Sequence, residues 1–339
     1  MGENTSQALL SIQDLNTWFF SRKGTAKAVN GVSFDLEAGK ILGVVGESGC
    51  GKSVTAQSVM RLVPDPPGKI MGGKILFHGQ DLVSMPMEEM RHIRGNRIAM
   101  IFQEPMTSLN PVYTIGDQIA EMFTLHKGYG KKQAMDAAAD MLKKVQIPSP
   151  HKRLHDYPHQ LSGGMRQRAM IAMALSCDPE ILIADEPTTA LDVTVQAQIL
   201  DLMLALKEDA GTAVQMITHD LGVIAEMADQ VVVMYAGQVV ESAATGELFK
   251  SPLHPYTRGL MQSVPVLGRR TRGKAGELNE IKGMIPSLLN LPVGCKFANR
   301  CPHVHAPCEQ SEPILEDAAP GHAVRCWLHS AQHSPEAAS

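Results

Sequence analysis

The first residues with a clear chemical potential are GESGCGKS at Gly46–Ser53, which have the spacing G-x-x-x-x-G-K-[ST]. Glycines at positions 46, 49 and 51 allow backbone N–H groups to turn inward and surround phosphate oxygens at a helix N-terminus. Lys52 is then placed to reach the β and γ phosphates, and the Ser53 hydroxyl to bind Mg²⁺. The sequence therefore predicts a nucleotide-binding loop.

The segments on both sides of this loop have the patterns that it requires. The apolar run KILGVV (40–45) predicts a buried strand before the loop, and SVTAQSVMRLV (53–63) predicts a helix after it. This order makes an ordinary glycine-rich turn a poor alternative. We expect the nucleotide to contact Gly46, Ser48, Gly49, Cys50, Gly51, Lys52, Ser53 and Val54.

A pair of carboxylates follows a second apolar run. In ILIADEP, Asp185 and Glu186 come at the end of a predicted buried strand, and the carboxyl ends of parallel strands face the ligand crevice. Asp185 suits the coordination shell of Mg²⁺, and Glu186 could deprotonate a water that attacks the γ phosphate. An Asp-Glu pair alone is weak evidence, but its position downstream of a phosphate loop strengthens the interpretation.

A second candidate anion site lies between these motifs. LSGGMRQR (161–168) opens a predicted helix with Ser162, Gly163 and Gly164, where free N–H groups and the helix dipole favour phosphate. The alternative is an ordinary N-cap formed by Ser162. Two phosphate-binding helix ends in one chain are most simply explained by a nucleotide held between two copies of the fold.

The cysteines are unevenly distributed, which suggests a further site. Four of the six lie near the C-terminal end, with five, six and seventeen residues between them: Cys295, Cys301, Cys308 and Cys326. Clustered cysteines in a cytosolic nucleotide binder suggest metal or redox chemistry. Structural zinc sites usually contain a close C-x₂₋₄-C pair, which is missing here, and four thiolates are equally the standard ligands of a 4Fe–4S cluster. The spacing leaves a cluster, zinc, and unliganded thiols or disulfides open. Cys50 and Cys177 are expected to fill space.

The elements that position these residues are expected to alternate between strand and helix. Residues 9–45 predict short strands, and 115–145 and 163–177 have helical spacing. Ile181–Asp185 and Ala213–Thr218 predict buried parallel strands, and Val231–Ser242 predicts a hairpin with its turn at Ala236–Gly237. Such an alternation favours a mostly parallel sheet covered by helices.

Composition bounds the class of protein. The chain has 339 residues, 44% of them apolar and 19% charged, which is typical of a globular protein larger than one domain. The net charge of −4 gives no support for binding nucleic acid. No secretory signal and no membrane-spanning segment are expected, although the protein could dock on a membrane protein. Pro, Gly, His and Cys become frequent beyond about residue 250, so we predict domains at 1–250 and 251–339.

In order, GESGCGKS, Gln103, LSGGM, ILIADEP, TALD and His219 resemble the motifs of ATP-binding cassette (ABC) ATPases, over about residues 10–245. The resemblance implies an α/β fold. Its P-loop NTPase (RecA-like) core has a mostly parallel sheet, with an antiparallel β subdomain and an α-helical signature subdomain at about 105–175. A small irregular C-terminal domain with the cysteines is expected in addition.

The resemblance also implies roles for single residues. Phe19 is expected to stack on adenine, with Trp18 as a competitor. Gln103 would sense Mg²⁺, which Ser53 and Asp185 also bind, and would face the membrane partner. Asp192 in TALD would cross the seam of a cassette dimer, and His219 would contact the γ phosphate. The signature departs from the family at Met165, where Gln is usual, which puts the contribution of that side chain in doubt.

Two further segments narrow the resemblance. HPYTRGL (254–260) and MIFQEPMTSLNP (100–111) are similar to segments of oligopeptide and dipeptide importer ATPases, in particular the first ATPase subunit. Nickel importers share this group, so the solute stays open. Because C-terminal regions of this kind carry a 4Fe–4S cluster, the resemblance favours the cluster over zinc.

The expected function is ATP hydrolysis that drives import of peptides or similar small solutes. The expected partners are a second, related ATPase subunit, two membrane permeases and, indirectly, an extracytoplasmic solute-binding protein, with no nucleic acid. The chain would lie peripherally on the cytoplasmic face of the inner or plasma membrane. The alternative is a soluble ABC ATPase in DNA repair or translation, but such proteins usually have two cassettes or a long coiled coil, and neither is visible in this sequence.

Overall fold

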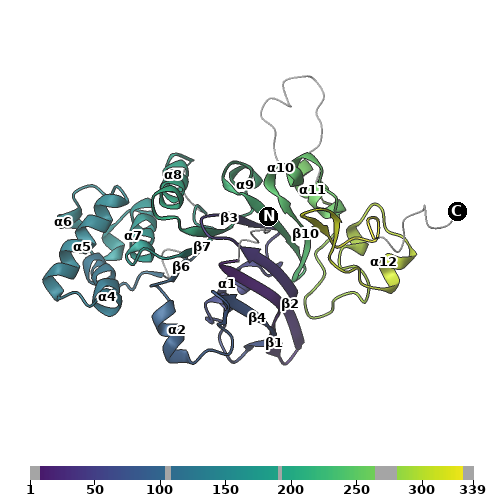
Figure 1. Ribbon diagram of the computed structural model, residues 1–339, viewed down its shortest axis with the longest axis horizontal. Coiled ribbons are helices and arrows are strands. Elements are labelled where there is room, and N and C mark those ends of the chain that lie inside the picture. The colour runs from purple at the N-terminus through teal and green to yellow at the C-terminus, as the bar shows by residue number, and fades with distance from the viewer. Residues whose placement is uncertain (1–7, 104–107, 190–192, 264–280, 331–339) are drawn as a thin grey trace, which may run out of the picture. The chain divides into compact units, whose positions relative to one another are not determined.

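The computed structural model describes residues 8–103, 108–189, 193–263 and 281–330 (Figure 1). The chain divides into two compact units. The first comprises residues 1–10, 36–41 and 77–217, and the second comprises residues 11–35, 42–76 and 218–339. The second unit therefore combines the phosphate loop with the region after residue 250. The predicted boundary near 250 stays a prediction.

The first unit contains a parallel sheet of buried strands. Strand β7 (Ile181–Asp185) lies between β6 (Ile98–Ile101) and β8 (Ala213–Ile217), and all fourteen of these residues are buried. Their uninterrupted apolar character is what a parallel strand covered on both faces requires. The sequence pattern predicts β7 and β8 correctly. The short β6 was not predicted.

A group of helices completes the first unit. The predicted helical segment 115–145 is two helices, α4 (Ile115–Lys127) and α5 (Lys131–Lys144), which pack on each other and on α7 (Gly163–Leu175) (Figure 1). The break comes at Gly128, whose φ of +69° ends α4 in a left-handed turn. The remaining helices are α2 (Met87–Ile93), α6 (Pro150–Arg153) and α8 (Val193–Ala210), and Gln80–Asp81 form the short strand β5.

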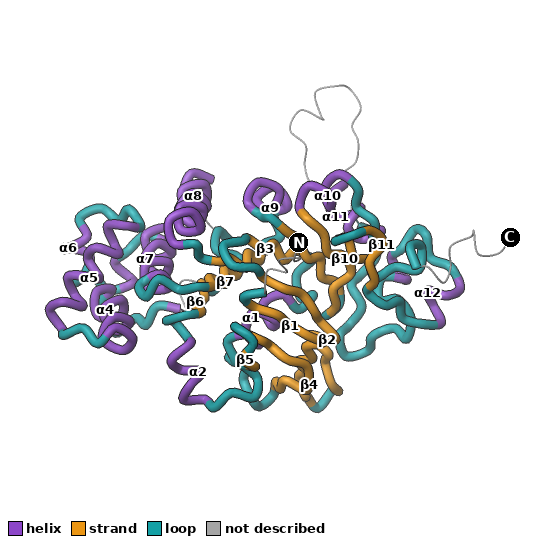
Figure 2. The backbone as a smooth tube through the Cα atoms, in the orientation of Figure 1, coloured by secondary structure: helices purple, strands orange, loops and turns teal. Residues whose placement is uncertain are grey.

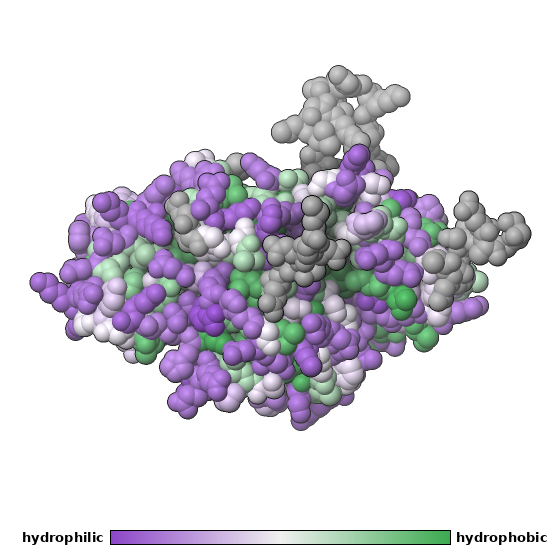
Figure 3. Space-filling model, viewed as in Figure 1, coloured by the Kyte–Doolittle hydropathy of each residue, from purple (hydrophilic) through white to green (hydrophobic). Residues whose placement is uncertain are grey.

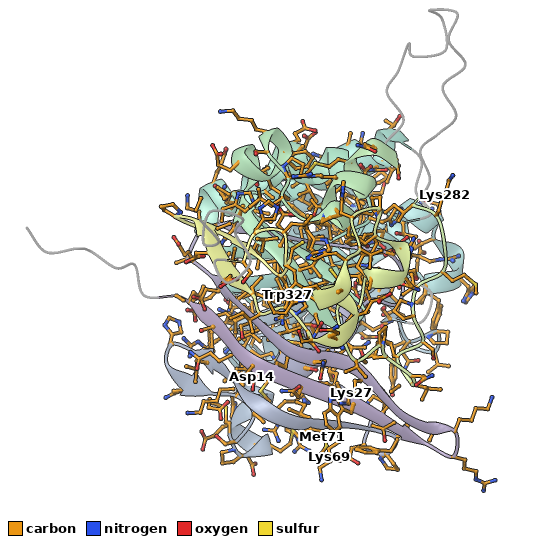
Figure 4. All side chains as sticks on the ribbon, turned by 90° about the vertical axis from the view of Figure 1, so that its right-hand side faces the viewer. Asp14, Lys27, Lys69, Met71, Lys282 and Trp327 are labelled. Carbon is orange, nitrogen blue, oxygen red and sulfur yellow. The ribbon has the colours of Figure 1, made fainter. Side chains whose placement is uncertain are left out.

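Most of the second unit's strands form two groups, which Figure 2 shows in orange. In one group β1 (Leu10–Ser21) lies between β2 (Gly24–Leu36) and β4 (Gly68–Phe77). Figure 4 labels Asp14, Lys27, Lys69 and Met71 on these neighbouring strands. The prediction of short strands in this part of the chain is wrong, because β1 has 12 residues and β2 has 13.

The other group begins at β3 (Ile41–Val45), which leads into the phosphate loop and pairs in parallel with β9 (Gln230–Tyr235). The predicted hairpin is confirmed, since β9 pairs antiparallel with β10 (Gln238–Ala244) around a turn at Ala236–Gly237 with φ of +46° and +84°. Helix α1 (Lys52–Val59) follows the loop as predicted but ends four residues earlier than the pattern suggested.

The C-terminal region continues this second group of strands. Strand β12 (His322–Val324) pairs antiparallel with β10, and β11 (Glu316–Ala319) pairs with β12. The other elements are α9 (Leu221–Met227), α10 (Thr245–Lys250), α11 (Pro255–Ser263), η3 (Ala298–Arg300) and α12 (Ala306–Gln310). Strand pairing therefore joins the cysteine-containing segment to the hairpin.

One buried carboxylate connects the hairpin to the C-terminal region. Glu241 on β10 is fully buried, and its oxygens accept hydrogen bonds from the backbone N–H groups of Leu253 and His254, at 2.7 and 2.9 Å. Its Oε1 also lies 2.8 Å from Nε2 of His322 on β12. Loss of such a carboxylate would leave several buried polar groups without a partner.

We expect Glu241→Ala to lower the free energy of unfolding by about 3 kcal/mol, because removal of the buried acceptor leaves three hydrogen-bonding groups without a partner. Chemical denaturation of the full chain measures the change. Glu247→Ala, on the exposed side of α10, is the matched control and should change the midpoint little. Equal, small effects of the two substitutions would contradict a structural role for Glu241.

Candidate nucleotide site

The backbone of the phosphate loop is held in a shape that only glycine can adopt. Gly46 has φ of +151°, and a Cβ there would lie 2.2 Å from the carbonyl oxygen of Met234. Gly51 has φ of +105°, and a Cβ there would lie 2.3 Å from the carbonyl oxygen of Ala28. Gly49 differs, because its φ of +78° requires glycine while the space beside it is open. Neighbouring backbone thus enforces the loop at both ends.

Lys52 is buried and held over the loop by backbone carbonyls. Its ammonium donates to the carbonyl oxygen of Gly46 at 2.7 Å and to that of Glu47 at 3.1 Å. The Cys50 sulfur lies 3.7 Å from the same Nζ. Burial raises the pKa of the Cys50 thiol, an effect that Lys52 opposes, so Cys50 is an uncharged, space-filling side chain as expected. Ser53 lies in the first turn of α1, next to Lys52.

His219 belongs to the same unit as the loop. The preceding residue, Thr218, donates its N–H to the carbonyl oxygen of Val44 on β3, at 3.4 Å. His219 itself is exposed, and the next residue, Asp220, caps α9 by accepting from Gly222 and Val223. A strand contact on one side and a helix cap on the other therefore hold the short segment that carries the predicted γ-phosphate histidine.

The two aromatic candidates for adenine stacking differ in their surroundings. Phe19 is half-buried, and its ring lies against Gly68, where a Cβ would come within 2.8 Å of it. It shares its face of β1 with Thr17, whose hydroxyl lies 2.9 Å from that of Ser58 on α1. Trp18 points to the opposite face, where Lys27 lies 4.9 Å from the ring centroid. Phe19 therefore lies on the face of β1 that is directed toward α1, the helix that follows the phosphate loop.

The first unit brings Gln103 and Glu186 together. Gln103 Nε2 donates to Glu186 Oε2 at 3.1 Å, and the Thr189 hydroxyl donates to the same oxygen at 2.8 Å. The backbone of Glu186 is unusual, with φ of +47°, and its N–H donates to the carbonyl oxygen of Ile217 on β8. Asp185 is buried at the end of β7. Both predicted carboxylates thus lie at the carboxyl edge of the parallel strands.

The structure also places the signature segment. Ser162 is the N-cap of α7 and accepts from the N–H of Met165 at 3.3 Å. Gly163 has open space where a Cβ would be, whereas Gly164 faces Val195 at 3.3 Å. Further along α7, the buried Gln167 donates to the carbonyl oxygen of Pro187 at 2.6 Å. Helix α7 is therefore tied to the turn that follows Glu186.

Two residues qualify the sequence-based picture of the site. Asp192 lies outside the described residues. Thr189 was not proposed as a site residue, although its hydroxyl contacts Glu186. Its position three residues after the carboxylate, within TALD, was the signal that could have found it.

Within the parts of the chain that the structure describes, no helix is long and apolar enough to cross a membrane, and the face in Figure 3 is largely hydrophilic.

Comparisons with known proteins agree with this geometry. Residues 29–189 match the model of the ABC transporter family, and residues 240–308 match that of the oligopeptide/dipeptide transporter C-terminal region. The chain belongs to the ABC transporter ATP-binding subunits. Its match to the second model places it in the oligopeptide/dipeptide group, as the resemblance predicted.

The similarity to known relatives extends over almost the whole length of this chain. A probable peptide ABC transporter ATP-binding protein of Sinorhizobium fredii is 54% identical over 94% of both chains. An oligopeptide transport ATP-binding protein of Bacillus subtilis is 51% identical over 95% of this chain and 97% of its own length. A dipeptide transport ATP-binding protein of the same organism is 50% identical over 97% of each. None of these names supports the alternative of a soluble ATPase in DNA repair or translation.

The fold is that of solved ABC cassettes. The dimeric cassette MJ0796, in a post-hydrolysis state bound to ADP and phosphate, matches with a TM-score of 0.63 and 24% identity, covering 70% of this chain and 98% of its own. CbiO1 of Clostridium perfringens matches with a TM-score of 0.60. This ABC subunit is thus an ATPase that drives import, and ATP with Mg²⁺ is its nucleotide substrate.

Proposed function

We propose that this subunit drives the import of peptides or chemically similar small solutes. The observation that carries the proposal is the C-terminal match over residues 240–308 to the region found in oligopeptide and dipeptide transporters. Relatives at 50–54% identity are named for peptide, oligopeptide or dipeptide transport. The solute itself would be selected by the permeases and the solute-binding protein, which leaves the ATPase with the energy-supplying step.

Glu186 is the proposed general base for hydrolysis. Because Gln103 and Thr189 both donate to its Oε2, the carboxylate is held in one orientation at the strand end. A fixed carboxylate can align a water and accept its proton as the water attacks the γ phosphate. Gln103 has a second proposed role. Because it is hydrogen-bonded to the base Glu186, it can couple the state of that base to the surface where the permease docks.

Phosphate binding is assigned to the second unit. Lys52, whose ammonium already bonds loop carbonyls, would neutralise charge on the β and γ phosphates, and His219 would contact the γ phosphate. Ser53, Asp185 and Gln103 would provide the oxygen donors that Mg²⁺ prefers, and the ion would neutralise charge on the phosphate oxygens. Phe19 would stack on adenine.

A second ATPase subunit completes the proposed site. The exposed Ser162 and the open space at Gly163 leave the N-terminus of α7 accessible to a phosphate held by another cassette. Asp192 would lie at the seam between the two cassettes. We expect the partner to be a related subunit, and the description of the solved MJ0796 cassette as dimeric supports this expectation.

A groove on the helical group is the proposed docking site for a permease. It has a volume of about 800 Å³ and lies beside α4, lined by residues between 108 and 135 and by Met173. Ser108, Asn110, Tyr113, Gln118, Glu121 and Met135 are among its lining residues. Tyr113 is 55% exposed, and its neighbour Val112 is 72% exposed. Docking there would place the subunit peripherally on the cytoplasmic face of the membrane.

The four C-terminal cysteines are proposed to hold a 4Fe–4S cluster. Burial raises the pKa of Cys326 to about 12 and that of Cys295 to about 11, and the neighbouring cysteines of the set contribute to both shifts. The N–H of Cys295 donates to the carbonyl oxygen of Cys308 at 2.8 Å, and the N–H of His303 to the Cys301 sulfur at 3.4 Å.

Basic residues neighbour several of these cysteines in the sequence. Lys296, next to Cys295, is buried and lies 2.8 Å from Glu312, and Arg325, next to Cys326, lies 3.8 Å from the same carboxylate group. In the described residues, no group of three or more His, Cys, Asp or Glu side chains is arranged to hold a metal ion, so the proposed cluster rests on the cysteine spacing and the family resemblance. Zinc remains the alternative.

Glu186→Gln is expected to retain ATP binding but to lower ATP turnover by about 10²- to 10⁴-fold, because the amide cannot accept the proton of water. Turnover is measured in the assembled transporter, and binding in the isolated subunit. Glu88→Gln, an exposed carboxylate on α2, is the control and should behave as wild type. Equal turnover in the Glu186 variant and wild type would remove this residue from the role of base.

Tyr113→Asp should lower the recovery of permease subunits with this chain by about tenfold, since a charge replaces an exposed aromatic in the groove. Co-purification from membranes measures the recovery, and ATP affinity of the isolated subunit should not change. Met87→Ala alters an exposed apolar side chain that does not line the groove and should leave recovery intact. Unimpaired recovery with Tyr113→Asp would place the permease elsewhere, whereas tight association of wild type with ribosomes or DNA would refute the transport function.

Anaerobic purification should yield about four iron and four sulfide per chain. Cys301→Ser should lose most of the iron, because a cluster with three thiolates is less stable, and Cys177→Ser in the first unit should retain it. Iron, acid-labile sulfide and zinc are assayed on the same samples. Stoichiometric zinc without iron would show that the cysteines bind zinc rather than a cluster. The absence of any metal would leave the region as a thiol-bearing module.

A further inference from the structure

Two side chains from the C-terminal region hold Glu47, the second residue of the phosphate loop. Arg300 donates from Nη1 and Nη2 to the two carboxylate oxygens of Glu47, at 2.6 and 2.9 Å. The hydroxyl oxygen of Tyr256 accepts the backbone N–H of Glu47 at 2.8 Å. Both residues lie after position 250, outside the segment that matches the ABC transporter model. The nucleotide loop is therefore supported from a part of the chain that carries none of its motifs.

Arg300 is held in this position by burial, contacts with aromatic rings and further hydrogen bonds. Its side chain is only 3% exposed, and its guanidinium lies 5.8 Å from the ring centroids of both Tyr235 and Phe297. The remaining donors reach the carbonyl oxygens of Ile281 and Lys282, at 3.0 and 3.2 Å. Lys282 is labelled in Figure 4. The hydrogen bonds to Glu47 raise the pKa of Arg300, so the guanidinium is always charged. A bidentate pair in such a setting has one geometry.

Glu47 transmits this constraint to the residues that bind phosphate. Its carbonyl oxygen accepts from Lys52 Nζ at 3.1 Å and from the N–H of Cys50 at 3.3 Å. The N–H, the carbonyl and the carboxylate of one residue are thus all engaged. Tyr256, which is fully buried, occupies the N–H and keeps that part of the loop in place.

The charge of Glu47 makes this support necessary. A carboxylate in a loop that surrounds a triphosphate repels the ligand, and the repulsion is strong where water is partly excluded. The Glu47 side chain is 26% exposed, so solvent screens it incompletely. Arg300 places a positive charge directly on that carboxylate, so the loop does not face the nucleotide with an uncompensated negative charge.

Arg300 also immediately precedes one of the clustered cysteines. It is the last residue of η3, and Cys301 caps this turn with its N–H directed to the carbonyl oxygen of Ala298 at 3.3 Å. Because the two residues are adjacent in this turn, a displacement of Cys301 would disturb the backbone that carries Arg300. This connection runs entirely through described residues and does not depend on what the cysteines bind.

We propose that Arg300 is a positioning residue for ATP binding, which neutralises Glu47 and fixes the phosphate loop, and that the C-terminal region thereby controls nucleotide affinity. The inference rests on the proposed role of Gly46–Ser53 as the phosphate-binding loop. Because coupling between two sites is reciprocal, ATP bound at the loop must in turn stabilise the segment that holds Arg300.

A double-mutant cycle on the full-length chain tests the charge role, with MgATP as the ligand. Arg300→Ala should weaken MgATP binding by about tenfold, because Glu47 is left uncompensated. Glu47→Gln should change affinity by less than about threefold, and the double variant should bind like Glu47→Gln. If Arg300→Ala does not fold, Arg300→Gln, which keeps hydrogen-bond donors without the charge, has the same expected result.

The control is Arg325→Ala, which removes another largely buried arginine of the C-terminal region whose hydrogen bonds go to Val239 and Pro313. It should bind MgATP like wild type. Arg300→Ala within twofold of wild type, equal losses in the two arginine variants, or no rescue in the double variant would each overturn the proposal. Failure of wild type to bind MgATP would instead refute the proposed function.

Hydrogen exchange tests the reciprocal effect. MgATP should slow the exchange of backbone amides at 281–283 and 298–301 in wild type by several-fold, and this protection should be lost in Arg300→Ala. A merely structural arginine would not make protection of these amides depend on the nucleotide. Unchanged exchange in wild type on addition of saturating MgATP would contradict the proposed coupling.

Discussion

The phosphate loop depends on close backbone contacts with segments from distant parts of the sequence. Gly46 and Gly51 lie so close to the carbonyls of Met234 and Ala28 that no side chain fits at either position. The loop therefore keeps its shape only while β2, β3 and β9 stay in register around it. The parallel pairing of β3 with β9 and the hydrogen bond from Thr218 to Val44 serve that requirement.

Polar contacts hold much of the C-terminal region, where several large apolar side chains, including Met284, Val293 and Ile314, stay exposed. Glu241 receives hydrogen bonds from Leu253 and His254 and pairs with His322, and Arg300 pairs with Glu47. A smaller aromatic group of Tyr235, Tyr256, His254 and Phe297 packs between these two points. Hydrogen bonds of this kind favour one arrangement over others because each misplacement leaves a polar group without its partner. Such contacts suit a region that adjusts a neighbouring site.

Much of the local structure could be predicted from short-range patterns. The buried runs of β7 and β8, the glycine-containing turn between β9 and β10 and the start of α1 all follow from residues close in sequence. The predictions failed where pairing with neighbouring strands decides the length of an element. Strands β1 and β2 extend to 12 and 13 residues because they pair with each other and β1 also pairs with β4. The exposed positions along them interrupt the apolar pattern and made the strands look short.

The sequence by itself determined the chemistry, because the spacing of Gly46–Ser53, Asp185–Glu186 and Ser162–Gly164 is a property of neighbouring residues. Tertiary structure alone decided how these groups are held. Gln103 meets Glu186 across 83 positions, and Arg300 meets Glu47 across 253. No local periodicity encodes such partners, because they meet only after strand pairing and burial have brought their segments together. The sequence does not distinguish an exposed charged side chain from a buried one. Only the fold therefore showed that the Glu47 carboxylate has a guanidinium as its partner.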